Sequence, residues 1–222
     1  TTGGANVAVG GGALRDLNGG NYNTAIGESA GLEITTGSYN TFAGHMASSD
    51  NTTGQRNSTY GAYAAEKTTT GSYNTALGGW ALQINTTGGY NTAIGYYALQ
   101  LATQSYQVAV GHTSLAACTT GQANTAIGYR SGQALTTGEA NVFVGYDSGY
   151  NHTTGSYCVK IGRNSAYSAT DDSNIIALGY QAAYNLTAGT SINIGYNSGY
   201  DHTTCHTNIC IGDNTDSDSG NN

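Results

Sequence analysis

The chain of 222 residues has no proline, only six lysines and arginines, and charged residues at 9% of its positions. The basic residues are scattered and form no stripe that could neutralise phosphates, so the sequence disfavours nucleic-acid binding. No apolar run is long enough to span a membrane, which argues against membrane insertion. The chain begins inside a repeat, without an initiator methionine or a signal peptide. We interpret it as a fragment of a longer chain or as a mature piece.

What the chain has instead is a strict repeat rich in glycine, threonine, asparagine and tyrosine. Such a composition also occurs in disordered segments, but here an aliphatic residue followed by glycine returns, with one exception, along the whole chain. Ten of the twelve spacings between the anchor glycines are 17 residues and two are 16. The anchors are Gly10, Gly27, Gly44, Gly61, Gly78, Gly95, Gly111, Gly128, Gly145, Gly162, Gly179, Gly195 and Gly212. We therefore expect one repeat domain over residues 1–215 and, over residues 216–222, an acidic polar tail or a linker to a missing segment.

Each repeat places mostly β-branched or aliphatic residues three positions and one position before its anchor, such as Thr92 and Ile94 before Gly95. Two such residues share one face of an extended chain, and this pattern is typical of a strand. We expect these two columns to form the interior. The small residues two before the glycine then face the opposite way, where another chain could approach closely. They are Ala8, Ala25, Ala76, Ala93, Ala109, Ala126 and Ala177.

The rest of the repeat predicts how one copy folds back on itself. A small residue always stands three positions after the anchor, which predicts a second short strand pressed against the first. Thr-Thr-Gly segments between copies are typical of turns, because glycine adopts positive φ without a steric penalty. Seventeen residues are too few for a unit that contains a helix, so neighbouring copies must stack. The sequence thus predicts an all-β fold, a parallel β-solenoid of about 13 coils spaced about 4.8 Å apart.

Asparagine recurs four positions before the anchor. Stacked amides can form hydrogen bonds from coil to coil, and the alternative is an exposed asparagine at a strand edge. The column consists of Asn6, Asn23, Asn40, Asn57, Asn74, Asn91, Asn124, Asn141 and Asn208.

The segments Asn6–Gly10, Asn91–Gly95 and Asn124–Gly128 carry the motif Asn-x-Ala-aliphatic-Gly. In this motif the chain resembles the head repeats of trimeric autotransporter adhesins. It is also similar to tail-fibre-like repeat proteins with Tyr-Asn-Thr-Ala-Ile-Gly and Gly-Tyr-x-Ser-Gly-Tyr, seen here at residues 90–95 and 145–150. The resemblance covers essentially the whole chain and implies a left-handed β-roll, three chains side by side, and a passive role in a surface fibre. The adhesin repeat is shorter, and the chain shows no coiled-coil stalk or anchor domain.

The residues with chemical potential form no familiar catalytic or metal site. Glycoside cleavage needs two carboxylates at a defined separation, whereas the thirteen acids are dispersed, with Asp171 and Asp172 in a turn region and Asp213, Asp216 and Asp218 near the end. The densest metal-capable group is His202, Cys205, His206 and Cys210, whose spacing matches no common zinc site. For these cysteines a Cys205–Cys210 disulfide, a zinc site and free thiols all stay open. Cys118 and Cys158 stand in different columns, so stacking does not pair them. We expect no enzyme activity and no cofactor.

Tyrosine is the most prominent surface residue and falls into three columns of the repeat. Aromatic columns can stack for stability, or they can grip sugars or another chain. The columns are Tyr22, Tyr39, Tyr73, Tyr90, Tyr106 and Tyr157; Tyr96, Tyr129, Tyr146, Tyr180 and Tyr196; and Tyr150, Tyr167, Tyr184 and Tyr200. Sequons at Asn51, Asn57, Asn85, Asn151 and Asn185 would permit glycosylation in a secretory route.

These observations favour a non-enzymatic structural or adhesive fibre segment of a virion, tail fibre or cell surface. We expect an extracellular location, a homo-oligomer (a trimer or an end-to-end filament) and contact with a surface glycan or receptor. The alternative is an ice-binding β-solenoid, which needs threonine ranks on a flat face. A glycan-cleaving tailspike is a further, less favoured alternative.

Overall fold

The computed structural model describes residues 3–215, except for the side chains of Ala188, Cys205 and His206. The described chain is all-β and forms a parallel β-solenoid, which confirms the predicted fold class, and no membrane-spanning helix occurs in it. Its contacts fall into two compact units: unit 1 is residues 1–112, with β1–β7, and unit 2 is residues 113–222, with β8–β13. The strands are β1 (Val7–Val9), β2 (Thr24–Ile26), β3 (Thr41–Ala43), β4 (Ser58–Tyr60), β5 (Thr75–Leu77), β6 (Thr92–Ile94), β7 (Val108–Val110), β8 (Thr125–Ile127), β9 (Val142–Val144), β10 (Val159–Ile161), β11 (Ile175–Leu178), β12 (Ala188–Ile194) and β13 (Thr204–Ile211).

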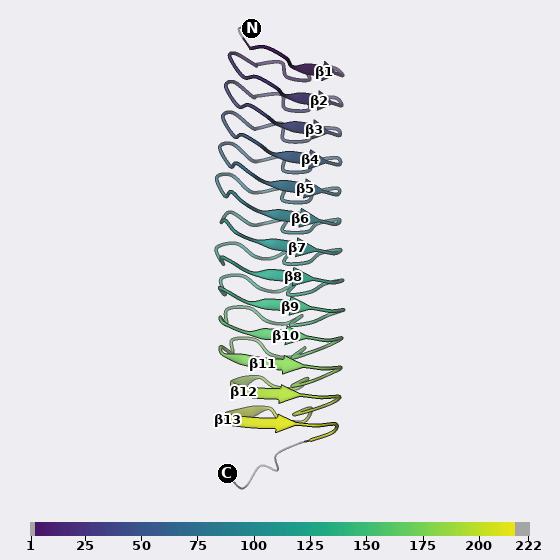
Figure 1. Cartoon of the computed structure of the whole chain (residues 1–222), viewed down its shortest axis with the longest axis vertical. Coiled ribbons are helices and arrows are strands. Elements are labelled where there is room, and N and C mark those ends of the chain that lie inside the picture. The colour runs from purple at the N-terminus through teal and green to yellow at the C-terminus, as the bar shows by residue number, and fades with distance from the viewer. Residues whose placement is uncertain (1–2, 216–222) are drawn as a thin grey trace. The chain divides into compact units, whose positions relative to one another are not determined.

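Within each unit, every strand pairs in parallel with the strand one repeat away. Thr75 lies opposite Thr92 in unit 1, and Val142 lies opposite Val159 in unit 2. In each unit the strands follow one another in chain order along one side of the coils (Figure 1). Each repeat is therefore one coil, and equivalent residues of successive coils form columns.

The interior is the reverse of the predicted one. The residue two before the anchor glycine, at the middle of each short strand, is buried from the second coil onward. The buried members are Ala25, Phe42, Thr59, Ala76, Ala93, Ala109, Ala126, Phe143, Lys160, Ala177, Asn193 and Cys210. The flanking residues face outward, as shown by Ile26 at 49% and Leu77 at 46% exposure. The prediction that these alanines accept another chain is therefore wrong, because only the coil's own narrow interior lies on their side.

The other half of each coil is built from turns rather than from the predicted second strand. The small residue three after the anchor is buried in most coils, but it lies in a turn in which Ala47 donates its N–H to the carbonyl of Gly44. The next residue, Ser48, instead donates to Ala64 one coil on. The backbone thus alternates between bonds inside the turn and bonds to the neighbouring coil. No ladder of strand hydrogen bonds results, and the interior there is closed by side chains at the third, fourth and seventh positions after the anchor.

The anchor glycines are fixed by close approach of the backbone. All of them have φ between +123° and +144°, a region that side chains rarely adopt. A Cβ atom added at Gly128 would lie 2.3 Å from the carbonyl oxygen of Gly145 in the next coil. The same clash recurs along each unit, which is a physical reason for a glycine at this place in every coil.

The asparagine column is buried from Asn23 to Asn141 and bonds from coil to coil, so for these residues the alternative of an exposed strand-edge residue is wrong, while Asn6 and Asn208 are half-buried. The Oδ1 atom of Asn57 accepts the backbone N–H of Asn74 at 2.9 Å, and its Nδ2 atom donates to the Gly71 carbonyl at 2.9 Å. Asn40 and Asn141 make the equivalent bonds. Each amide therefore satisfies two backbone groups of the connecting segment that would otherwise be buried without partners.

Bulky inward residues occur where a neighbouring position is glycine. Phe42 lies against Gly31, where an added Cβ would approach the ring to 2.6 Å. Phe143 lies in the same way against Gly132 and Gly149, again at 2.6 Å. The coil has a nearly constant interior volume, so a large side chain in one column requires a glycine, which has no side chain, in a neighbouring column.

Candidate interaction surface

The outward face of the sheet carries a row of exposed apolar side chains in each unit. Its two columns, three positions and one position before the anchor, contain no charged residue in any repeat. Ile26, Leu77 and Ile127 are 49%, 46% and 42% exposed. The column beside them in unit 1 is mostly threonine and is half-buried. Contiguous apolar surface of this kind marks an interaction site more often than it occurs by chance on a soluble protein.

The tyrosine columns stack, which confirms the first of the two interpretations. In unit 1 the ring centroids of Tyr73 and Tyr90 lie 4.8 Å apart with an interplanar angle of 4°, and Tyr106 continues the stack at 5.4 Å. In unit 2 the rings of Tyr150, Tyr167, Tyr184 and Tyr200 stack in sequence, at 5.1 to 5.3 Å. Because neighbouring rings cover each other's faces, these ladders present mainly ring edges and hydroxyls to solvent.

Arginine side chains lie against the rings of the tyrosine ladders. The guanidinium of Arg56 lies 5.5 Å from the ring centroid of Tyr39 and 5.4 Å from that of Tyr73, so it bridges the stack. In unit 2 the Nε atom of Arg130 donates to Asp147 at 2.8 Å, and Tyr150 lies 4.6 Å from its guanidinium. The carboxylate of Asp147 raises the pKa of Arg130. These contacts tie one coil to the next.

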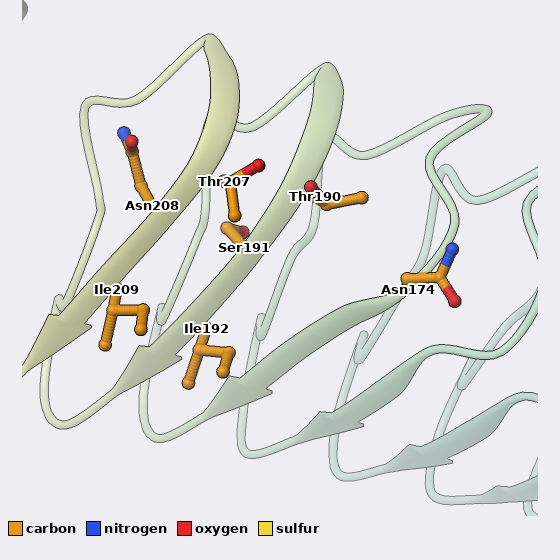
Figure 2. A pocket seen from close by; sticks show the side chains of 7 residues that line it. All are labelled: Asn174, Thr190, Ser191, Ile192, Thr207, Asn208 and Ile209. Carbon is orange, nitrogen blue, oxygen red and sulfur yellow. The ribbon is translucent and has the colours of Figure 1, made fainter. Parts of the chain in front are cut away.

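A shallow cavity of about 200 Å³ lies on unit 2, where the tyrosine column five before the anchor ends. The spacing from Gly179 to Gly195 is 16 residues, and the pairing of β12 with β13 shifts register between Thr190 and Ser191. Figure 2 shows Ile192 and Ile209 side by side on these two strands, with threonine hydroxyls nearby. The lining residues are Asn174, Thr190, Ser191, Ile192, Thr207, Asn208 and Ile209.

The predicted metal and disulfide residues lie at the last coil. Cys210 is buried in the inward column, while the side chains of Cys205 and His206 lie outside the described part. The Cys205–Cys210 disulfide therefore stays a prediction. Among the described residues, no group of three or more metal-capable side chains comes together. Cys118 and Cys158 are buried, and neither forms a disulfide.

The acids and the sequons receive different environments. Asp171 accepts hydrogen bonds from Thr153 and Thr154, which lower its pKa, whereas burial raises the pKa of Asp172. Asp213 is exposed, and Asp216 and Asp218 lie outside the described residues.

Of the five sequons, those of Asn51, Asn57 and Asn85 are buried and Asn151 and Asn185 are half-buried. Glycosylation of the first three would not fit the folded coil.

Sequence reasoning missed a buried pair of basic side chains in unit 2. Lys160 and His152 are both fully buried, and the lysine Nζ lies 2.9 Å from the imidazole Nδ1. The imidazole Nε2 lies 2.9 Å from the carbonyl oxygen of Gly155. Because an ammonium only donates, Nδ1 accepts and Nε2 carries the proton that it donates to Gly155. The sequence does show a lysine, Lys160, in a column of mostly small residues. This points to a buried lysine only once the column is known to face inward.

Burial sets the protonation of the pair. Burial, followed by the nearby Lys160 charge, lowers the pKa of His152 to about 3. Burial also lowers the pKa of Lys160 to about 8. The ring of Phe143, with its centroid 5.6 Å from the ammonium, provides an additional favourable contact. At neutral pH the pair is therefore a protonated lysine donating to a neutral histidine.

No family model, curated protein or solved structure matches this chain. The resemblance to autotransporter head repeats and to tail-fibre-like repeats stays a prediction, as do the left-handed coil and the trimer.

Proposed function

We propose that this chain is a non-enzymatic segment of an extracellular fibre, of a tail fibre, virion or cell-surface adhesin type. The observation that carries the proposal is the uncharged outward face of the sheet. It repeats one pattern along each unit at the spacing of parallel strands, about 4.8 Å. A surface with this period is best matched by a surface with the same period. A second copy of the chain supplies one, so copies associate laterally through this face in a homo-oligomer.

The ladders that connect one coil to the next support a role as a durable spacer. Stacked tyrosines, the asparagine column and bridging arginines all connect one coil to the next, which suits a fibre that must resist unravelling. Exposed tyrosine edges and threonine hydroxyls offer hydrogen bonds to a surface glycan or receptor. In this proposal neither nucleic acid nor membrane lipid is a partner.

The test is to place charge on the outward face of unit 1. In the double variant Ile26→Lys and Leu77→Lys, two exposed side chains become cations without change to the interior. The matched control, Gln55→Lys and Thr87→Lys, adds the same charge at exposed connecting positions. Sedimentation equilibrium should give oligomers for the wild type and the control and monomers for the face variant, all with the same circular dichroism. A wild type that stays monomeric at about 100 μM would overturn lateral association, since weak specific interfaces are populated at such concentrations.

Ice binding is a second candidate, because the structure turns a threonine column outward. Thr24, Thr75 and Thr92 lie on the same face as Ile26, Leu77 and Ile94. They form regular threonine–aliphatic ranks, whereas the sequence alone placed this column inside. Thermal hysteresis that is present in monomeric wild type and lost in the face variant would favour this function over the fibre.

A further inference from the structure

The Lys160–His152 pair closes a turn of unit 2 onto a strand. His152 follows the turn that includes Gly149, and Lys160 is the inward residue at the middle of β10. The same imidazole also bonds the carbonyl of Gly155, so one ring holds both the strand and the connecting segment. An added Cβ at Gly149 would lie 3.2 Å from the Lys160 side chain, so the glycine leaves the space through which the lysine reaches the ring.

We propose that this pair is an acid-sensitive latch in unit 2. At neutral pH the imidazole accepts a hydrogen bond from the ammonium and keeps residues 149–160 closed. Protonation of His152 removes that acceptor and leaves two cations in contact inside the coil, and the segment opens to hydrate them. The opening is reversible, because a rise in pH restores the acceptor.

The groups around the pair do not offset this repulsion by direct contact. The carboxylate of Asp171 is engaged by Thr153 and Thr154. Asp172 is buried, and burial raises its pKa, so its carboxylate becomes neutral at a higher pH than an ordinary aspartate. Cys158 donates its thiol to the Asp172 carbonyl at 3.3 Å, and burial raises its pKa, so it stays uncharged. Phe143 presents a ring edge-on to His152 at 5.4 Å and carries no charge.

The sign of the effect follows from proton linkage. The pKa of His152 falls from 6.5 to about 3 in the folded chain, so the open form binds the proton more tightly than the closed form. The free energy that the neutral imidazole contributes to closure is therefore fully present above about pH 6.5, and it is lost progressively as the pH falls toward 3. Between pH 7.5 and pH 5 the opening equilibrium constant should rise about 30-fold.

Hydrogen exchange read by mass spectrometry tests the latch on the whole chain. Peptides covering residues 149–160 should show an opening constant about 30-fold higher at pH 5 than at pH 7.5, after correction for the intrinsic exchange rate. The matched control is His152→Asn, because Asn85 at the equivalent position donates to the Gly88 carbonyl at 2.8 Å. This variant keeps the bond to the connecting segment but cannot take up a proton, and its opening constant should not change with pH.

Two results would overturn the latch. One is a wild type whose opening constant is the same at pH 5 as at pH 7.5. The other comes from nuclear magnetic resonance of the imidazole in Lys160→Met. Without the ammonium the histidine should titrate at a higher pH than in the wild type, while both proteins remain folded at pH 7.5. A titration that does not move shows that the lysine has no part in the response.

Discussion

Removal of one asparagine from the buried ladder should cost unit 1 several kcal/mol. In Asn57→Ala the N–H of Asn74 loses its acceptor at 2.9 Å, and the carbonyl of Gly71 loses its donor at 2.9 Å. Asn57 itself is 1% exposed, so water does not replace these partners without opening the coil. An unsatisfied buried polar group costs about 1–3 kcal/mol, which gives about 2–6 kcal/mol for the two.

Trp80 provides the assay, because it is the only tryptophan and lies in unit 1. Its ring stacks on Tyr63 at 5.3 Å, so its fluorescence changes when this part of the unit unfolds. Urea titrations of the wild type, Asn57→Ala and the control Gln55→Ala should show a lower midpoint for the first variant alone. Gln55 is exposed two residues away. If Asn57→Ala lost less than about 1 kcal/mol, the ladder would not be satisfying buried groups as described.

Three further predictions concern the interior of the coils. Gly31→Ala should lower the melting temperature, because the new Cβ meets the Phe42 ring at 2.6 Å. Adding Phe42→Ala should restore most of the lost melting temperature. If it restores none, the glycine is not there to make room for the phenylalanine ring. Gly128→Ala should be more damaging and not rescued by a side-chain change, because the clash at 2.3 Å is with the Gly145 backbone; a melting temperature equal to the wild type's would refute this. Lys160→Met should stabilise unit 2 at pH 7 by about 3 kcal/mol, from the fall in the Lys160 pKa from 10.5 to about 8. The unfolded chain holds the Lys160 ammonium proton more tightly than the folded chain, so the wild type gains stability as the pH rises from 8 to 10.5. Chemical denaturation should therefore show that the greater stability of Lys160→Met disappears above pH 10.5.

The sequence predicted the features of the fold that depend on period. An aliphatic residue before glycine at nearly constant spacing, from Gly10 to Gly212, is sufficient to predict one coil per repeat, because only stacked copies can bury a face. Strand positions follow from alternation at Thr92 and Ile94. The asparagine at position 57 follows from the same logic, since a buried turn needs a partner for its backbone.

Which side of each strand faces inward was decided only by the tertiary structure. A three-residue strand has one central and two flanking side chains, and alternation states that they point to opposite sides without stating which side is enclosed. The turns make that choice: a coil of 17 residues encloses so little space that only the central side chain fits, usually alanine. Ile26 and Leu77 consequently point outward despite their hydrophobicity. The same choice places Lys160 beside His152, a contact between residues that the repeat pattern does not relate. Period and alternation are local properties that a sequence displays directly, whereas the enclosed side and the contacts inside it depend on how the turns close the coil in three dimensions.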